Sequence, residues 1–129
     1  MFFFKKKNQS TDVAASTTKT EVVGPDLRVR IEQLKNELEV ANSDLRIQIL
    51  NELGSKLFAL QETDAAIQYY ELSIQENRSL GKAYTDLLKL YNIKRKEAAL
   101  SNNDKQVQQY LNKIDALMKL SKDVIRGLD

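Results

Sequence analysis

The chain has 129 residues, enough for one compact domain of ordinary size but not for two independent cores. Apolar residues make up 42% of the chain and charged residues 29%, with one proline and four glycines. This composition is too apolar for an entirely disordered chain and too poor in turn residues for a many-stranded β fold. We therefore expect an all-α fold.

The formal net charge is +2, and the whole excess lies near the start of the chain. Residues 1–24 contain four lysines and two carboxylates, so the remainder is neutral. Nucleic-acid binding needs several cations clustered on one face. We therefore do not expect nucleic acid as a partner.

Cysteine and histidine are both absent. Their absence removes thiolate nucleophiles, imidazole bases and the usual zinc ligands. The carboxylates are scattered over expected polar helix faces, and the chain has no glycine-rich phosphate loop. We expect a protein that is not an enzyme and that holds no cofactor and no metal.

The first residues combine aromatic and basic side chains, in the order Phe2-Phe3-Phe4-Lys5-Lys6-Lys7. A secretory signal has its positive charge before an apolar segment of about 7 to 15 residues, so this order does not fit one. No stretch approaches the roughly 20 apolar residues that span a bilayer. We expect a cytoplasmic protein.

The same tip is a candidate for membrane contact. Each lysine near an anionic membrane contributes about 1 kcal/mol, and partly inserted phenylalanines add to this. These values suit reversible adhesion at the inner membrane face. The candidate membrane-contact residues are Phe2, Phe3, Phe4, Lys5, Lys6 and Lys7. The alternatives are a tip without a role, or aromatic side chains that fold back onto the rest of the chain.

The sequence changes character at Gly24. Residues 8–23 are polar, rich in Ser and Thr and without an apolar period, so we predict that residues 1–24 form a disordered basic tail. Pro25 and Asp26 are typical of a first helical turn, where the missing proline N–H costs nothing and a carboxylate faces the positive helix end. We assign residues 25–129 to one helical domain.

Apolar residues at spacings of three and four predict five helices in this domain. They span about residues 25–41, 44–61, 63–76, 80–100 and 105–128, and polar residues such as those at 42–44 and 101–104 separate and cap them. On the last helix the main apolar stripe is expected to consist of Val107, Leu111, Ile114, Met118, Ile125 and Leu128, with Tyr110, Leu117 and Val124 widening it.

Two segments of the chain match each other at a distance of 34 residues. Leu50-x-x-Leu53-Gly54-x-x-Leu57 corresponds to Tyr84-x-x-Leu87-Leu88-x-x-Tyr91, and the first copy continues with Ala66 and, four residues later, Tyr70. With this period and pattern, residues 43–120 resemble the tetratricopeptide-repeat (TPR) family. Gly54 and Ala66 are small enough for the two helices of a pair to approach closely. The alternative is an unrelated helical bundle that matches by chance.

The second copy departs from the family pattern. Leu88 replaces the small residue, and Val107, the counterpart of Ala66, follows it by 41 residues instead of 34. We therefore expect the fourth helix to be seven residues longer, which is about two turns and preserves the phase of its apolar face.

The resemblance implies antiparallel helix pairs stacked as a short TPR-like array, with the first and last helices flanking it. It also implies a non-catalytic adaptor or scaffold that binds a protein or peptide in a groove lined by the first helix of each pair. The family positions transfer to Gln48, Asn51, Ser55, Phe58, Lys82, Thr85, Asp86, Lys89 and Asn92. For each residue the competing interpretation is a solvated helix face. The basic run at 94–96 is a further surface of this kind, either solvated or a docking patch.

Two repeats are fewer than the three or so that usually form a stable stack, so both ends need a cover. We expect the first helix and the end of the last helix to supply it within the chain. The alternative function is a structural subunit that assembles into a homo-oligomer through these terminal amphipathic helices.

Overall fold

The computed structural model describes residues 12–78 and 80–127, with side chains described from Pro25 onward. Within these residues the chain forms five α-helices and no strand, which confirms the expected all-α fold. The helices are α1 (Asp12–Leu38), α2 (Ser43–Ala59), α3 (Thr63–Glu76), α4 (Gly81–Leu100) and α5 (Asp104–Arg126). None of them is long and apolar enough to cross a membrane.

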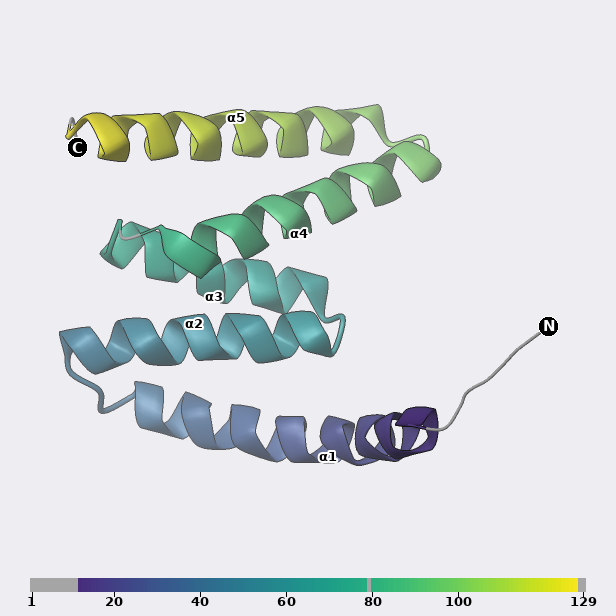
Figure 1. Cartoon of the computed structure of the whole chain (residues 1–129). Helices are drawn as coiled ribbons and strands as arrows, with labels where there is room; N and C mark the ends of the chain where they lie inside the picture. The colour runs from purple at the N-terminus through teal and green to yellow at the C-terminus, as the bar shows by residue number, and fades with distance from the viewer. Residues whose placement is uncertain (1–11, 79, 128–129) are drawn as a thin grey trace.

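The helices stack in chain order, from α1 at one edge to α5 at the other (Figure 1). Each helix packs against the next one and runs antiparallel to it, because short loops join consecutive helices. Of the helices described, α2 and α4 are the one pair in contact that are not consecutive in the chain. The protein is therefore an array of antiparallel helices in which α2 and α4 also contact each other.

The polar residues between the helices cap them as predicted. The Asn42 side chain accepts a hydrogen bond from the Leu45 N–H at 3.0 Å, and the Asn103 side chain accepts one from the Gln106 N–H at 3.1 Å. Each bond satisfies a backbone N–H that has no partner within its own helix. Helices α2 to α5 begin and end within about two residues of the predicted bounds.

The start of α1 differs from the prediction. The helix begins at Asp12 and has Pro25 in its interior rather than in its first turn. A proline inside a helix removes one backbone hydrogen bond and bends the helix, but it does not stop the preceding residues from being helical. In Figure 1 the purple end of α1 turns away from the direction of the rest of the helix. Of the predicted tail, residues 1–11 lie outside the described residues, and Gly24 does not mark a helix start.

The core lies at the contacts between α1, α2, α3 and α4, and Leu117 of α5 is buried in it as well. On α3, five residues spaced along one helix face are buried. They are Ala66, Ile67, Tyr70, Ser73 and Ile74. On α1, Ile31 and Leu34 are buried in the same core, so the stripe of the first helix is covered within the chain as expected.

The closest contact in the core joins α2 to α3. Gly54 lies against the ring of Tyr70, and a Cβ atom placed on Gly54 would lie 2.8 to 2.9 Å from three atoms of that ring. Tyr70 is fully buried, so the ring has no solvent to move into. The absence of a side chain at position 54 therefore sets the distance between the two helices.

The last helix packs on α4 with a different part of its surface than predicted. Leu117, expected at the edge of the stripe, is the buried residue of α5, whereas Leu111, Met118 and Ile125 are 39%, 43% and 80% exposed. Lys113 forms an ion pair with Glu71 of α3 at 3.0 Å, and Glu71 also accepts a hydrogen bond from Tyr91 of α4 at 2.5 Å. Helix α5 thus covers α4 but leaves a second apolar ridge uncovered.

Replacement of Gly54 by alanine tests the close contact with Tyr70. Alanine favours a helix interior over glycine by about 1 kcal/mol. We nevertheless expect Gly54→Ala to lower the free energy of unfolding by about 1–3 kcal/mol, because the buried ring must shift to admit the methyl group. Urea denaturation measures the change. Gln48→Ala on the exposed face of α2 is the control and should change stability by less than about 0.5 kcal/mol. A Gly54→Ala variant as stable as the native protein would contradict this account.

Candidate partner-binding face

The predicted binding residues belong to two helices, α2 and α4. Spacings of three and four residues keep a set of side chains on one side of a helix. The α2 set is Gln48, Asn51, Ser55 and Phe58, and the α4 set is Lys82, Thr85, Asp86, Lys89 and Asn92. Helices α2 and α4 contact each other, so the two sets belong to neighbouring helices. We call the surface that carries these nine residues the α2–α4 face.

The nine residues differ in how far they reach into solvent. Gln48, Lys82, Thr85 and Lys89 are exposed. Asn51, Ser55, Phe58 and Asn92 are half-buried, and Asp86 is buried with 4% of its surface exposed. The exposed members can meet a partner directly, whereas the buried ones form the floor of the face.

A hydrogen-bonded group lies under the α2–α4 face. The Tyr70 hydroxyl donates to the Asp86 carboxylate at 2.6 Å, and the Lys82 ammonium donates to the same carboxylate oxygen at 2.7 Å. Tyr70 comes from α3, and the other two come from successive turns of α4. A buried carboxylate is costly unless it is paired, and here a hydroxyl and a cation both pair with it. Asp86 therefore links α3 to α4.

The group shifts the pKa of two of its members in opposite directions. Burial works against ionisation of Asp86, but the hydrogen bonds from Lys82 and Tyr70 outweigh it and hold the pKa of Asp86 below its usual value. Burial, with the hydrogen bond to Asp86, raises the pKa of Tyr70 well above the ordinary tyrosine range. At neutral pH the site thus contains an ionised carboxylate and a neutral hydroxyl.

Two amides on the α2–α4 face also have partners within the chain. The Ser73 hydroxyl donates to the Asn51 side chain at 2.5 Å, which joins α2 to α3. The Asn92 amide donates to the Leu88 carbonyl at 3.1 Å, and its oxygen accepts from the Arg95 guanidinium at 3.2 Å. These bonds hold both side chains in place before any partner arrives.

A pocket of about 370 Å³ opens where α2 ends beside α4. Phe58 and Ala59 from α2 and Ile93 and Glu97 from α4 line it, together with Gln61 and Thr63 from the loop and the start of α3. The family resemblance assigned Phe58 to the binding set but did not include Ile93. No sequence signal marks Ile93, because the pocket exists only where the α2–α3 loop crosses the lengthened α4.

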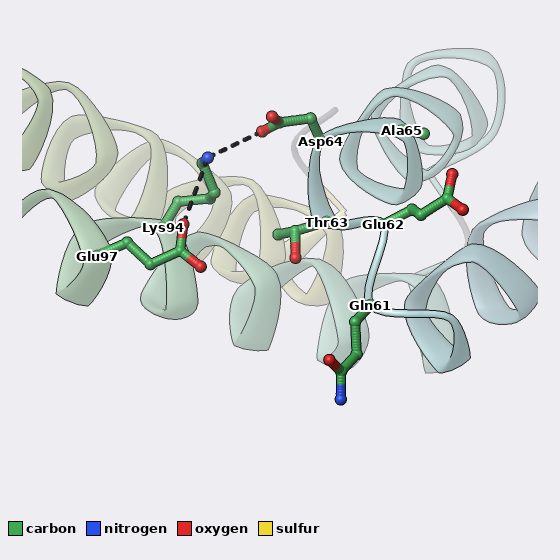
Figure 2. A pocket seen from close by; sticks show the side chains of 7 residues that line it. All are labelled: Gln61, Glu62, Thr63, Asp64, Ala65, Lys94 and Glu97. Carbon is green, nitrogen blue, oxygen red and sulfur yellow. Dashed lines mark ion pairs between the residues drawn. The ribbon is translucent and has the colours of Figure 1, made fainter.

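A second pocket, of about 470 Å³, adjoins the first one at the start of α3 (Figure 2). Lys94 projects into it and forms ion pairs with Asp64 at 3.1 Å and Glu97 at 3.5 Å. The bond to Asp64 raises the pKa of Lys94, and only 18% of the lysine side chain is exposed. Gln61 at the entrance has a positive φ of 62°, in the left-handed region.

The basic run at 94–96 does not form one patch. Lys94 turns to Asp64, Arg95 bonds to Asn92, and only Lys96 is fully exposed. The candidate membrane-contact residues Phe2 to Lys7 lie outside the described residues. In the part of the chain that the structure describes, no three acidic side chains approach closely enough to hold a metal ion.

Comparisons with protein-family models, with curated protein sequences and with solved structures each give no match. The resemblance to the TPR family thus depends on the residues quoted above.

Substitution of Asp86 tests the buried group through its pH dependence. At neutral pH we expect Asp86→Asn to lower the free energy of unfolding by about 1–3 kcal/mol, because a neutral amide weakens the bonds to Lys82 and Tyr70. The folded-state pKa of Asp86 is lowered, so its contribution is complete above the unfolded value of about 3.9 and is lost as the pH falls through the folded value. Urea denaturation from pH 7 to about pH 3 should therefore show the two proteins converging in acid. A difference that is constant over this range would contradict the assignment.

Proposed function

We propose that the chain is a non-catalytic interaction module, an adaptor or scaffold, that binds an extended peptide segment of another protein across the α2–α4 face. The observation that carries the proposal is the contact between α2 and α4, two helices separated by α3 in the chain. Near this contact lies a pocket that Phe58 and Ile93 line together with the polar side chains of Gln61, Thr63 and Glu97.

The chemistry of the face suits an extended peptide. Gln48, Thr85 and Lys89 are exposed and offer hydrogen bonds and a positive charge along the surface. The pocket between Phe58 and Ile93 accommodates one apolar side chain of the partner. A few polar contacts around an apolar anchor are the usual composition of such sites. We infer a peptide that carries an acidic group opposite Lys89 and an aliphatic or aromatic group at the pocket.

The rigidity of the floor favours binding. Asp86, Asn51 and Asn92 are held by bonds within the chain, so the face loses little conformational entropy when a partner is ordered on it. The resemblance to the TPR family supports the same surface, because α2 and α4 correspond to the first helices of its two pairs. We also propose a cytoplasmic location for the protein.

A peptide-library selection tests the face without a known partner. We expect purified full-length protein to select 12-residue peptides that carry an acidic and a bulky apolar residue. Lys89→Glu should raise the dissociation constant of a selected, fluorescently labelled peptide by about tenfold or more, equivalent to about 1.4 kcal/mol. Lys105→Glu, which changes an exposed lysine on α5, is the matched control and should bind as the native protein does. Equal binding by Lys89→Glu and the control would refute the assignment.

We propose in addition that the tip of the tail adheres to anionic membranes. The three lysines at positions 5 to 7 contribute about 1 kcal/mol each near such a surface. We expect full-length protein to co-sediment with vesicles that contain phosphatidylserine, and to be released when all three lysines are changed to serine. Vesicles of phosphatidylcholine alone are the control. Undiminished binding by the serine variant would exclude this role for the tail.

A further inference from the structure

We propose that α5 is the interface for a second copy of this chain, paired antiparallel through the ridge formed by Leu111, Met118 and Ile125. The three side chains recur every seven residues along one line of the helix, and all three are exposed. Ile114 and Ser121 lie half-buried beside them and complete an alternation of three and four residues. A line of this kind is the seam by which two helices pack side by side.

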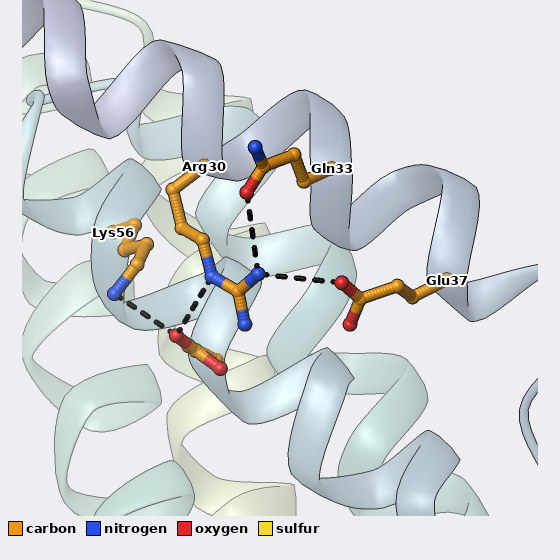
Figure 3. Close-up of polar contacts among 5 residues, drawn as sticks. Arg30, Gln33, Glu37 and Lys56 are labelled. Atoms are coloured by element: carbon orange, nitrogen blue, oxygen red, sulfur yellow. Dashed lines mark hydrogen bonds and ion pairs between the residues drawn. The ribbon is translucent and has the colours of Figure 1, made fainter.

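At the opposite end of the array, the described side chains of α1, from Pro25 onward, form no comparable surface. Ile31 and Leu34 of α1 are buried against the core. The charged residues beside them also have partners, since Arg30 contacts Glu37 at 3.3 Å and Glu52 at 3.6 Å (Figure 3). Among the side chains that the structure describes on the two terminal helices, those of α5 expose an apolar line.

The charges beside the ridge select a second copy as its occupant. Asp115 and Lys122 are seven residues apart on the outer flank of the ridge, away from α4, and both are exposed. Among the residues described, neither has an ion-pair partner within 4.0 Å, whereas Lys119 between them is paired with Asp123. One negative and one positive side chain on the same flank complement a copy of themselves when the two helices run in opposite directions.

The register of the pair follows from this pattern. If Met118 lies opposite Ser121 of the second copy, Ile114 lies opposite Ile125 of the second copy and Asp115 opposite Lys122 of the second copy. Two-fold symmetry then gives two equivalent ion pairs. A shift by seven residues places Asp115 opposite Asp115 of the second copy, which is repulsive. A parallel pair brings Asp115 and Lys122 next to apolar residues that face α4, so no ion pair forms.

The same charges disfavour binding of a membrane or of the basic tail to the ridge. A membrane would have to accept the Asp115 carboxylate beside the inserted ridge, and an anionic surface would repel it. The lysines at positions 5–7 are not expected to bind beside the ridge, because Lys122 balances the negative charge of Asp115 there. The ridge is small, with three large side chains on each copy, so we expect a weak dimer at the low end of interface sizes.

Sedimentation equilibrium of the full chain tests the dimer. We expect a monomer–dimer equilibrium with a dissociation constant of about 10–100 µM, measured between about 5 and 500 µM protein. Met118→Ser should raise this constant by about tenfold or more. Asp115→Lys and Lys122→Asp should each do the same, and the double variant Asp115→Lys/Lys122→Asp should restore native dimerisation. Circular dichroism checks that each variant is folded, and Lys105→Asp is the matched charge control.

Several outcomes would overturn the proposal. A native protein that is monomeric up to about 500 µM has no such interface. A double variant that remains as weak as the single ones excludes the antiparallel register. If the native protein binds vesicles through Met118 without self-association, the ridge contacts membrane instead. If self-association appears only after Phe2, Phe3 and Phe4 are changed to serine, the tail occupies the ridge. Because Lys89 belongs to α4 and the seam to α5, loss of the dimer by Met118→Ser and loss of peptide binding by Lys89→Glu are distinguishable.

Discussion

One side chain, Tyr70, joins three of the five helices. Its ring occupies the space left by the missing side chain of Gly54 on α2, and its hydroxyl donates to Asp86 on α4. The first contact depends on the smallest residue and the second on a buried charge, so neither tolerates an ordinary substitution. Since α3 lies between α2 and α4 in the chain, the position of Tyr70 determines how these two helices meet.

The α2–α4 face follows from that arrangement. Its exposed residues, such as Gln48 and Lys89, lie above a floor that Tyr70, Asp86 and Asn51 hold through bonds to α3 and α4. The pocket beside Phe58 and Ile93 forms where the face ends. Packing and the proposed peptide binding are thus divided between neighbouring positions of the same helices. A residue one turn away from a proposed binding position can be indispensable for the fold.

Much of this structure could be predicted from the sequence, for identifiable reasons. Short polar breaks with capping side chains such as Asn42 and Asn103 end each helix at a definite place. On α3, the buried residues recur at spacings of three and four along one face, so this set follows directly from the helical period. Gly54 and Ala66 indicated a close approach between α2 and α3. In the structure, Gly54 lies directly against the ring of Tyr70.

Other features depend on tertiary partners that a local pattern does not contain. Asp86 was assigned to a binding surface, because nothing local indicates that a tyrosine 16 residues earlier would bury it. Helix α5 has two overlapping apolar lines, and periodicity alone could not decide whether Leu117 or Met118 faces α4. Pro25 indicated a helix start, but the residues before it are helical as well. Ile93 lines a pocket only because a loop from another part of the chain lies beside it.

The bond between Tyr70 and Asp86 has a consequence for the conditions under which the fold can exist. It needs the carboxyl group ionised and the phenol neutral, and its environment lowers the pKa of one and raises that of the other. In acid, stability is lost as Asp86 takes up a proton. In alkali, the unfolded chain releases the phenolic proton above about pH 10, which the folded chain resists, so unfolding becomes more favourable as the pH rises. One hydrogen bond between two helices therefore helps to set both the lowest and the highest pH at which the fold is stable.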